Sequence, residues 1–426
     1  MKGLLWTFSG QGIKLILQVF YILGLAIILG PNMYGQIAII MSIIVVLSPF
    51  CGIGYGNILI KNIVTKTNKY KKTLGSTIVF LVISFVILEI ILVCLTYFIF
   101  GFNQSLLIIA LLLGMSDLIF LKISEFTSQI YLANANYKKS SIVQLNISLI
   151  RASSLVIFEM INRYFNLNLQ VIFWVYLYVA FTFIQSVNNL KNIFTFYGNP
   201  DFKDVKIKFN EIKEGIQFSI SLSAQGIYND VDKTVLGKFS GSTVAGYYSF
   251  AYKISDVVFF PVKALLSYTY PKFFEKGKNK NLFSTFEYAK KLSVIVTLYN
   301  ITVSAIAFFI LPYLFKYIGF LKQYQSSLEI VNYLLLLPIL KGIHYLFSDA
   351  LTGSGHQGKR TLIQVTVSVM NLILSVYFIK IYSWKGAVIA SLISDTLMVI
   401  FIFLCNIYLL KKMKKVGSFN ESTSNV

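Results

Sequence analysis

Residues 73–100 read TLGSTIVFLVISFVILEIILVCLTYFIF, an apolar stretch with one charged side chain, Glu89. A helix needs about 20 apolar residues to cross the hydrocarbon core of a bilayer, so this stretch predicts a membrane-spanning helix. The 426-residue chain shares this character, because 56% of its residues are hydrophobic and 13% are charged. A mean hydropathy of +0.70 lies outside the range of soluble domains and indicates an integral membrane protein.

Twelve stretches of the chain are long and apolar enough to be membrane helices. They predict an all-α integral membrane protein with about 12 transmembrane helices. The seventh is the most polar, since acidic residues and Lys233 lie in its second half. The predicted spans are 4–29, 36–60, 73–100, 105–131, 140–162, 168–190, 214–237, 243–270, 287–315, 326–350, 361–382 and 386–410.

Basic residues between the predicted helices orient the protein. The net charge is +21, but the lysines lie in short breaks between apolar segments, a pattern of membrane topology and not of nucleic-acid binding. With the N-terminus inside, 25 Lys and Arg residues fall on the cytoplasmic side and six on the other. The positive-inside rule therefore predicts that both termini are cytoplasmic.

The two halves of the chain resemble each other. Gln11-Gly12 and Gln225-Gly226 each precede a helix that ends in a G-x-x-x-x-G turn, at residues 30–35 and 241–246. Such echoes in the same order indicate a duplication. We therefore predict an N-terminal six-helix lobe, a cytoplasmic linker, a C-terminal six-helix lobe and a cytoplasmic tail, at residues 1–190, 191–213, 214–411 and 412–426.

An even number of helices in each half makes the two repeats parallel. Transporters with parallel repeats rock two lobes about a central site, so we expect a central cavity and alternating access. Pro49, with the nearby glycines, and Pro261 occupy corresponding positions in the two halves. They are either interruptions near that site or kinks that improve packing.

Charged residues inside the predicted helices are the candidate site. An ion in mid-bilayer costs at least about 2.5–3.5 kcal/mol, so a chain that keeps several has a hydrated, positive interior that suits an anion. Lys14 and Lys263 have no acid within one helical turn, whereas Lys122 with Glu125 and Lys253 with Asp256 are spaced for pairing. The candidate cations are Lys14, Arg151, Lys233, Lys253 and Lys263, with Lys341 nearer a helix end.

The acidic residues of these helices have two readings. They are either sites of a coupling ion or partners of the nearby cations, and the sequence leaves both open. The candidates are Asp117, Glu125, Asp232, Asp256 and Asp349, together with Glu89 and Asp395. His344 is either a hydrogen-bonded interior residue or a proton relay.

The sequence indicates a transporter and not an enzyme. It has no G-x-x-x-x-G-K-[ST] nucleotide loop, no metal-ligand pattern and no paired carboxylates on a loop. Cys51, Cys94 and Cys405 lie far apart within apolar runs and predict no disulfide. We expect no cofactor, no metal and no catalytic residue, and leave open a coupling to H+ or Na+.

The stretch from Asn229 to Phe274 carries a specific resemblance. It contains NDVDKTVLG at 229–237, AGYY at 245–248, AYK at 251–253 and Tyr270-Pro271. This resembles the Wzx-type polysaccharide flippases, which carry O-antigen or capsule repeat units. They belong to the multidrug/oligosaccharidyl-lipid/polysaccharide exporter (MOP) superfamily. The DALTGSG segment at 349–355 fits the same pattern, and the resemblance covers about residues 5–410.

The resemblance implies a lipid flippase of the bacterial inner membrane. Its substrate would be an undecaprenyl-diphosphate-linked oligosaccharide repeat unit, held by cavity cations, of which Lys233 and Lys253 lie within the matching motif. The implied partners are this lipid-linked oligosaccharide, membrane lipid, and a polysaccharide polymerase with its assembly proteins, with no nucleic acid. We expect a monomer.

Two other functions compete. A multidrug and toxin extruder of the same superfamily would bind organic cations through acidic residues in its first lobe, where this chain has Lys14. A membrane polysaccharide polymerase or glycosyltransferase would need a sizeable catalytic loop or paired acids, and neither is present.

Overall fold

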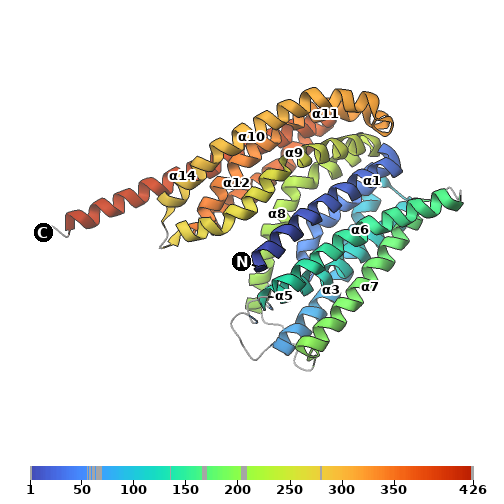
Figure 1. Cartoon of the computed structure of the whole chain (residues 1–426), viewed down its shortest axis with the longest axis horizontal. Coiled ribbons are helices and arrows are strands. Elements are labelled where there is room, and N and C mark those ends of the chain that lie inside the picture. Colours follow the sequence, from blue (N-terminus) through green and yellow to red (C-terminus); the bar gives the residue numbers. More distant parts are fainter. Residues whose placement is uncertain are drawn as a thin grey trace. The chain divides into compact units, whose positions relative to one another are not determined.

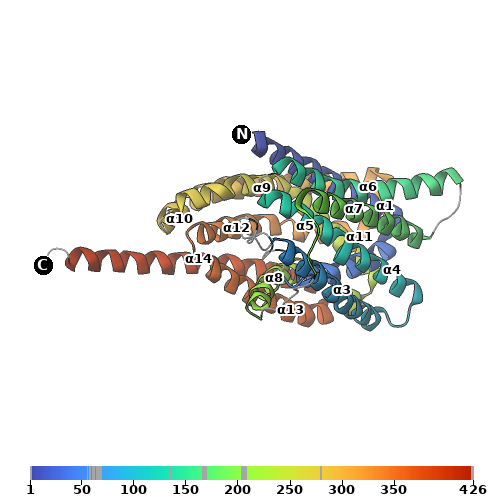
Figure 2. The same ribbon diagram turned by 90° about the horizontal axis from the view of Figure 1, so that it is seen from below.

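The computed structural model describes residues 2–54, 70–134, 136–165, 170–202, 209–278 and 281–423, with the single residues 56, 59 and 63. Within these residues the protein is helical and contains no strand (Figure 1; Figure 2). Each of the twelve predicted stretches overlaps a described helical segment. The prediction of an all-α membrane protein is confirmed.

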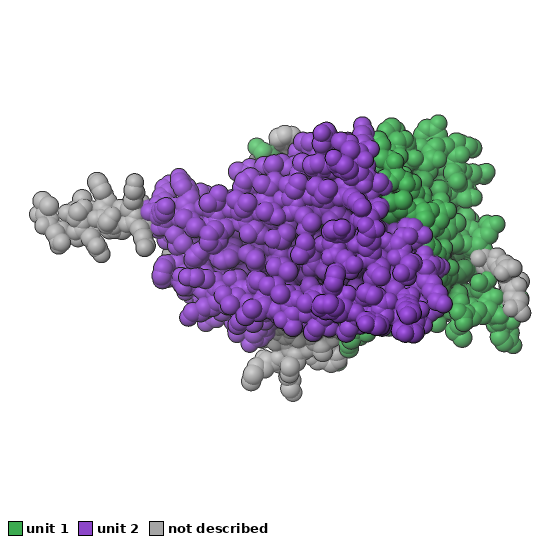
Figure 3. Space-filling model, turned by 90° about the horizontal axis from the view of Figure 1, so that it is seen from above, with its two compact units in different colours: residues 1–246 green, residues 247–426 purple. Residues whose placement is uncertain are grey.

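The described chain forms two compact units, residues 1–246 and 247–426, which Figure 3 colours separately. In the first unit, α1 packs against α6 and α8, α5 against α6 and α7, and α3 against α4. A π-helix, η2, continues α4 without a break. The helices of this unit are α1 (Lys2–Leu47), α3 (Tyr70–Phe100), α4 (Gln104–Gly114), η2 (Met115–Phe120), α5 (Leu121–Ala133), α6 (Tyr137–Phe165), α7 (Val171–Tyr197) and α8 (Phe209–Ser240).

Helix α9 (Ser242–Lys276) continues from the first unit into the second. In the second unit, α12 is central, because α10, α13 and α14 all pack against it. The core between these helices contains Leu346, Phe347 and Ile402, each almost fully buried. The helices of this unit are α10 (Leu282–Tyr317), α11 (Gln325–Leu334), α12 (Leu337–Gly353), α13 (Gln357–Tyr382) and α14 (Trp384–Thr423).

Eight of the described helical segments are long and apolar enough to span a membrane, or nine if α11 and α12 count as one bent span. The remaining predicted spans have two explanations. Helix α1 combines the first two predicted spans, which are separated by a kink at Gly30. Helices α8 and α9 carry several charged residues, including candidate cations of the site. These charges make both helices too polar to be recognised as spans by composition alone.

The first glycines of the two G-x-x-x-x-G turns both have a left-handed backbone. The first glycine of each, Gly30 and Gly241, has a positive φ of 70° and 88°, which favours glycine because it lacks a Cβ. The second glycines pack against the opposite turn. A Cβ on Gly35 would overlap the Ser242 carbonyl, and one on Gly246 would overlap the Pro31 carbonyl. The two turns therefore meet backbone to backbone within the first unit.

Small residues also join α8 to the second half of α1. Ser223 Oγ donates to the Val46 carbonyl at 2.8 Å, and Ser219 Oγ donates to the Pro49 carbonyl at 2.7 Å. Ser42 and Thr234 share a hydroxyl hydrogen bond of 2.5 Å. Membrane helices associate through small residues and interhelical hydrogen bonds because lipid offers no hydrophobic drive.

The helix of the second predicted span, 36–60, is interrupted within its described residues. Helix α1 ends at Leu47, and a 3₁₀ turn, η1 (Ser48–Phe50), follows because Pro49 cannot continue the helical hydrogen bonds. Pro261, by contrast, lies inside the continuous helix α9.

Part of the predicted cytoplasmic surface is not described. Helix α7 extends to Tyr197 and α8 begins at Phe209, so both helices enter the predicted linker 191–213. Within that linker, Lys203, Lys206 and Lys208 lie outside the described residues. The same holds for Lys61, Lys66, Lys69 and Lys280 among the cytoplasmic lysines.

Candidate functional site

Arg151 of α6 lies in a closed polar triad of the first unit. Its Nη2 donates to Asp117 Oδ1 of η2 at 2.6 Å, and its Nε donates to the Tyr178 hydroxyl of α7 at 3.1 Å. The Tyr178 hydroxyl in turn donates to Asp117 Oδ2 at 2.9 Å. Asp117 is therefore the partner of Arg151. Arg151 Nη1 has no hydrogen-bond partner among the described residues.

Lys14 of α1 has a neutral partner. Its ammonium donates to the Gln144 side-chain oxygen of α6 at 2.7 Å, and the Gln144 amide donates to Ser128 Oγ of α5. The charges of Glu125 and Arg151 also act on Lys14. Within the part of the chain that the structure describes, Lys14 forms no ion pair, so it contributes a half-buried cation to the interior of this unit.

Lys122 and Glu125 of α5 form the ion pair that their spacing predicted, at 2.9 Å. Lys122 also approaches Ser48 Oγ at 3.4 Å. With Lys14, Arg151 and Asp117, these residues form what we call the first-unit cluster. It holds three cations and two acids.

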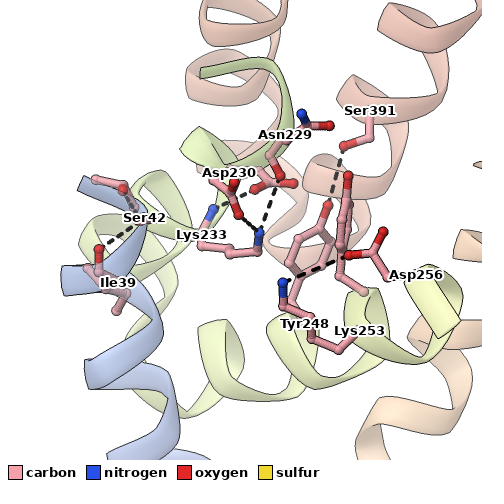
Figure 4. Close-up of polar contacts among 12 residues, drawn as sticks. Ile39, Ser42, Asn229, Asp230, Lys233, Tyr248, Lys253, Asp256 and Ser391 are labelled. Atoms are coloured by element: carbon pink, nitrogen blue, oxygen red, sulfur yellow. Dashed lines mark hydrogen bonds and ion pairs between the residues drawn. The ribbon is translucent and has the colours of Figure 1, made fainter. Parts of the chain in front are cut away.

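Lys233 of α8 is buried and pairs with Asp230, three residues earlier (Figure 4). Its ammonium also donates to the Asn229 carbonyl at 3.2 Å. Asp232, the acid named from the sequence, instead accepts the backbone N–H of Lys233 at 2.8 Å. The lysine of the N-D-V-D-K motif is thus held by residues of its own turn of α8.

Asp256 of α9 has three cations around it in the second unit. Lys253 approaches it at 3.8 Å (Figure 4), and Lys263, two turns further along α9, pairs with it at 3.0 Å. The charge of Lys341 also acts on Asp256. We call these four residues the second-unit cluster. Lys263 therefore has an acidic partner, Asp256, although no acid lies within one helical turn of it.

Other interior charges of the second unit have local partners. Lys341 is buried and donates to the Tyr252 hydroxyl at 2.5 Å, so its ammonium lies in the interior of the protein. Asp349 accepts from Arg360 at 3.2 Å across the α12–α13 junction. His344 Nε2 lies 3.4 Å from Asp395 Oδ1, and both side chains are almost fully buried.

Several residues of these clusters were not found from the sequence. Tyr178, Tyr252 and Gln144 each bind a candidate cation, and each comes from a helix distant in sequence. A signal existed for Gln144, because an amide inside an apolar helix requires a partner. Tyrosines are too common here to give one, since the chain has 27.

The two clusters suit an anion better than a metal or a cation. Each contains more basic than acidic side chains, three against two in the first unit and three against one in the second. No group of three or more His, Cys, Asp or Glu side chains that could hold a metal occurs among the described residues. A hard cation such as Ca²⁺ or Mg²⁺ would require carboxylate and water oxygens as ligands.

Comparison with known proteins identifies the fold and the family. The model of the polysaccharide biosynthesis protein family matches residues 1–276. No curated protein matches the chain.

Several solved transporter structures have the same fold. An inward-facing multidrug resistance MATE family transporter of the MOP superfamily is 14% identical, with a TM-score of 0.72 over 94% of this chain and 96% of the other. An outward-facing one is 13% identical, with a TM-score of 0.62 over 96% and 95%. A MOP superfamily transporter from Pyrococcus furiosus is 13% identical, with a TM-score of 0.61 over 94% of each chain.

These likenesses agree with the resemblance drawn from residues 229–274, and they confirm the predicted MOP-type membrane fold. Since the family model matches well over half of the 426 residues, the chain belongs to the polysaccharide biosynthesis protein family.

Proposed function

We propose that this protein is a flippase for an undecaprenyl-diphosphate-linked oligosaccharide repeat unit. It takes the lipid from the cytoplasmic leaflet of the bacterial inner membrane and delivers it to the outer leaflet by alternating access. The diphosphate binds to interior cations while the polyprenyl tail remains in lipid. The protein acts as a membrane transporter, with both termini in the cytoplasm.

The half-buried ammonium of Lys14 is the observation that carries this proposal. It lies in a membrane helix and its described partner is the neutral side chain of Gln144. Keeping such a charge in a bilayer costs several kcal/mol, on the order of 3, and a neutral amide does not offset that cost as a carboxylate would. A phosphate oxygen would, because charge-assisted hydrogen bonds to phosphate are the stronger kind.

Arg151 in the first unit and the second-unit cluster offer further cations for phosphate. Arg151 has one guanidinium nitrogen, Nη1, available for a second phosphate oxygen. Lys253 and Lys263 share a single carboxylate, Asp256, so phosphate can replace part of that interaction. Lys233 contributes less directly to phosphate binding, because its side chain is buried and paired with Asp230.

The membrane potential favours the proposed direction. Moving one elementary charge through 100 mV is worth about 2.3 kcal/mol. A diphosphate that leaves a negative interior is therefore driven outward. No nucleotide-binding loop occurs in the sequence, so this potential, an ion gradient or removal of the product supplies the work.

The polarity of the site separates this proposal from drug export. The solved relatives include multidrug resistance transporters, but one MOP superfamily structure is described as having a binding pocket of reversed polarity that suggests a different function. Fold does not decide substrate, and the residues of the site do. Here the cations outnumber the acids in both clusters, which favours an anionic headgroup over an organic cation.

The test uses purified protein in liposomes with a fluorescent lipid-diphosphate sugar. The wild type should move it between leaflets, and Lys14→Ala should slow this movement by about 10- to 100-fold, the worth of a lost charged hydrogen bond. Lys14→Arg should retain most of the rate because it keeps the charge. Normal flipping by Lys14→Ala, or export of an ethidium-like cation by the wild type, would contradict the proposal.

Lys385→Ala is the matched control. Lys385 forms an ion pair with Glu329 at 3.5 Å, with both side chains 58% exposed. Lys385→Ala removes one positive charge, as Lys14→Ala does, but from the exposed surface, and it should leave flipping unchanged. Equal insertion into membranes must be verified for all variants.

A further inference from the structure

Glu89 of α3 is a buried carboxyl group without a partner. It lies near the middle of the apolar stretch 73–100, and the residue is 8% exposed. Neither carboxyl oxygen has a hydrogen-bond partner among the described residues, and both are shielded from solvent. Its neighbours Val86, Ile87 and Ile90 are exposed on the outer faces of the same helix.

The carboxyl rests against Gly114 at the end of α4. A Cβ on Gly114 would come within 2.7 Å of Glu89 Cδ and closer still to both oxygens. Glycine at this position therefore makes the space that the carboxyl occupies. An ionised carboxylate in such an enclosed site has no protein donor to replace its hydration, so the enclosed form is the neutral acid.

No other charge explains the position of Glu89. Helix α3 packs against α4, η2, α1 and α8. Ionisable residues on these elements include Asp117, Lys14 and Lys233, and none forms an ion pair or hydrogen bond with Glu89 in the described structure. Its carboxyl is thus separate from both cationic clusters.

The π-helix η2 begins directly after Gly114 and carries Asp117, the partner of Arg151. Single π-turns inside α-helices are rare and often mark functional sites. The same short element therefore begins next to the Glu89 pocket and holds part of the first-unit cluster. Any movement of η2 that opens the pocket also moves Asp117.

We propose that Glu89 is a proton-binding site that couples protonation to the conformation of η2. The neutral acid is enclosed against Gly114. When water reaches the pocket, the O–H bond breaks, the proton passes to that water and the carboxylate remains hydrated, which keeps α3 and η2 apart. The ligand is a proton. The part of this inference that is tested by flipping rests on the proposed flippase function.

Glu89→Gln is the decisive variant, because the amide has the size of the neutral acid and fits beside Gly114. In liposomes, the wild-type flipping rate should change with pH by about threefold per pH unit at the midpoint, and by up to about tenfold per pH unit beyond it. Glu89→Gln should lose that dependence, so that its rates at acidic and alkaline pH agree. A wild-type pH profile in Glu89→Gln would overturn the proposal.

Glu159→Gln is the control for a carboxyl elsewhere in the same unit. Glu159 pairs with Arg163 at 2.5 Å, and the Arg163 side chain is 80% exposed. This variant should retain the pH response of the wild type. Loss of the response in Glu159→Gln as well would show that the effect is not specific to Glu89 and would overturn the assignment.

A second measurement does not depend on transport. Infrared difference spectra of wild type minus Glu89→Gln should contain the C=O band of a protonated carboxyl at neutral pH, which disappears as the pH is raised. A carboxylate band throughout would overturn the proton site even if flipping is normal. The band with no flipping would instead refute the flippase proposal and keep the proton site.

Discussion

The triad of Arg151, Asp117 and Tyr178 gives a prediction whose size follows from its geometry. Arg151→Ala removes the 2.6 Å ion pair and leaves Asp117, whose side chain is 8% exposed, with the Tyr178 hydroxyl alone. Removing one partner of a buried pair costs about 3–5 kcal/mol because it leaves a charge uncompensated. Asp117→Ala should cost a similar amount, because it leaves the Arg151 guanidinium without its carboxylate and the Arg151 side chain is only 26% exposed.

The double variant Arg151→Ala with Asp117→Ala should be less harmful than the two single changes together. It leaves the Tyr178 hydroxyl without those two partners, a cost of about 1–3 kcal/mol. The coupling between the two changes should therefore be at least about 3 kcal/mol. The triad would then be a structural unit that holds η2 against α6 and α7.

Unfolding in mixed micelles of increasing denaturant content measures the four free energies. Additivity of the two single changes to within about 0.5 kcal/mol would refute the reasoning. Arg151→Lys is a useful companion, because it keeps the charge but cannot bridge both Asp117 and Tyr178 as the planar guanidinium does. It should recover only part of the lost stability.

Two further predictions concern the packing of the turns and the sign of the site. Gly246→Ala should lower the thermal midpoint in detergent, at a cost of about 1–3 kcal/mol, because its Cβ would meet the Pro31 carbonyl, whereas Gly358→Ala, with nothing within 4 Å, should be neutral or slightly stabilising; equal midpoints would argue against the turn contact. Asp256→Asn should preserve flipping and Lys263→Ala should slow it, because the first removes the shared carboxylate and the second a cation; the reverse order in the liposome assay would contradict an anionic substrate.

Local contacts of the site followed from spacing. Lys122 with Glu125 and Lys253 with Asp256 lie three residues apart, and both pairs form. Lys263 and Asp256 are seven residues apart on the same face of α9, two turns of a helix. A search limited to one turn overlooked this pair, although the period of the helix contains it.

Contacts between helices could not be obtained in this way. Arg151 lies 34 residues from Asp117, and Lys14 lies 130 residues from Gln144. Each helix has polar residues on it, but the rotation and depth of one helix against another depend on the packing of all their side chains. The sequence therefore identified the cations without their partners.

By itself, the sequence determined that the chain is a bundle of membrane helices and roughly where those helices lie. These features depend on local composition, because a backbone in lipid must satisfy its hydrogen bonds within each helix. Only the tertiary structure decided which ions neutralise one another, that Lys14 faces an amide and that Glu89 faces Gly114. The physical reason is that these contacts join helices distant in sequence, and their distances depend on how the helices pack.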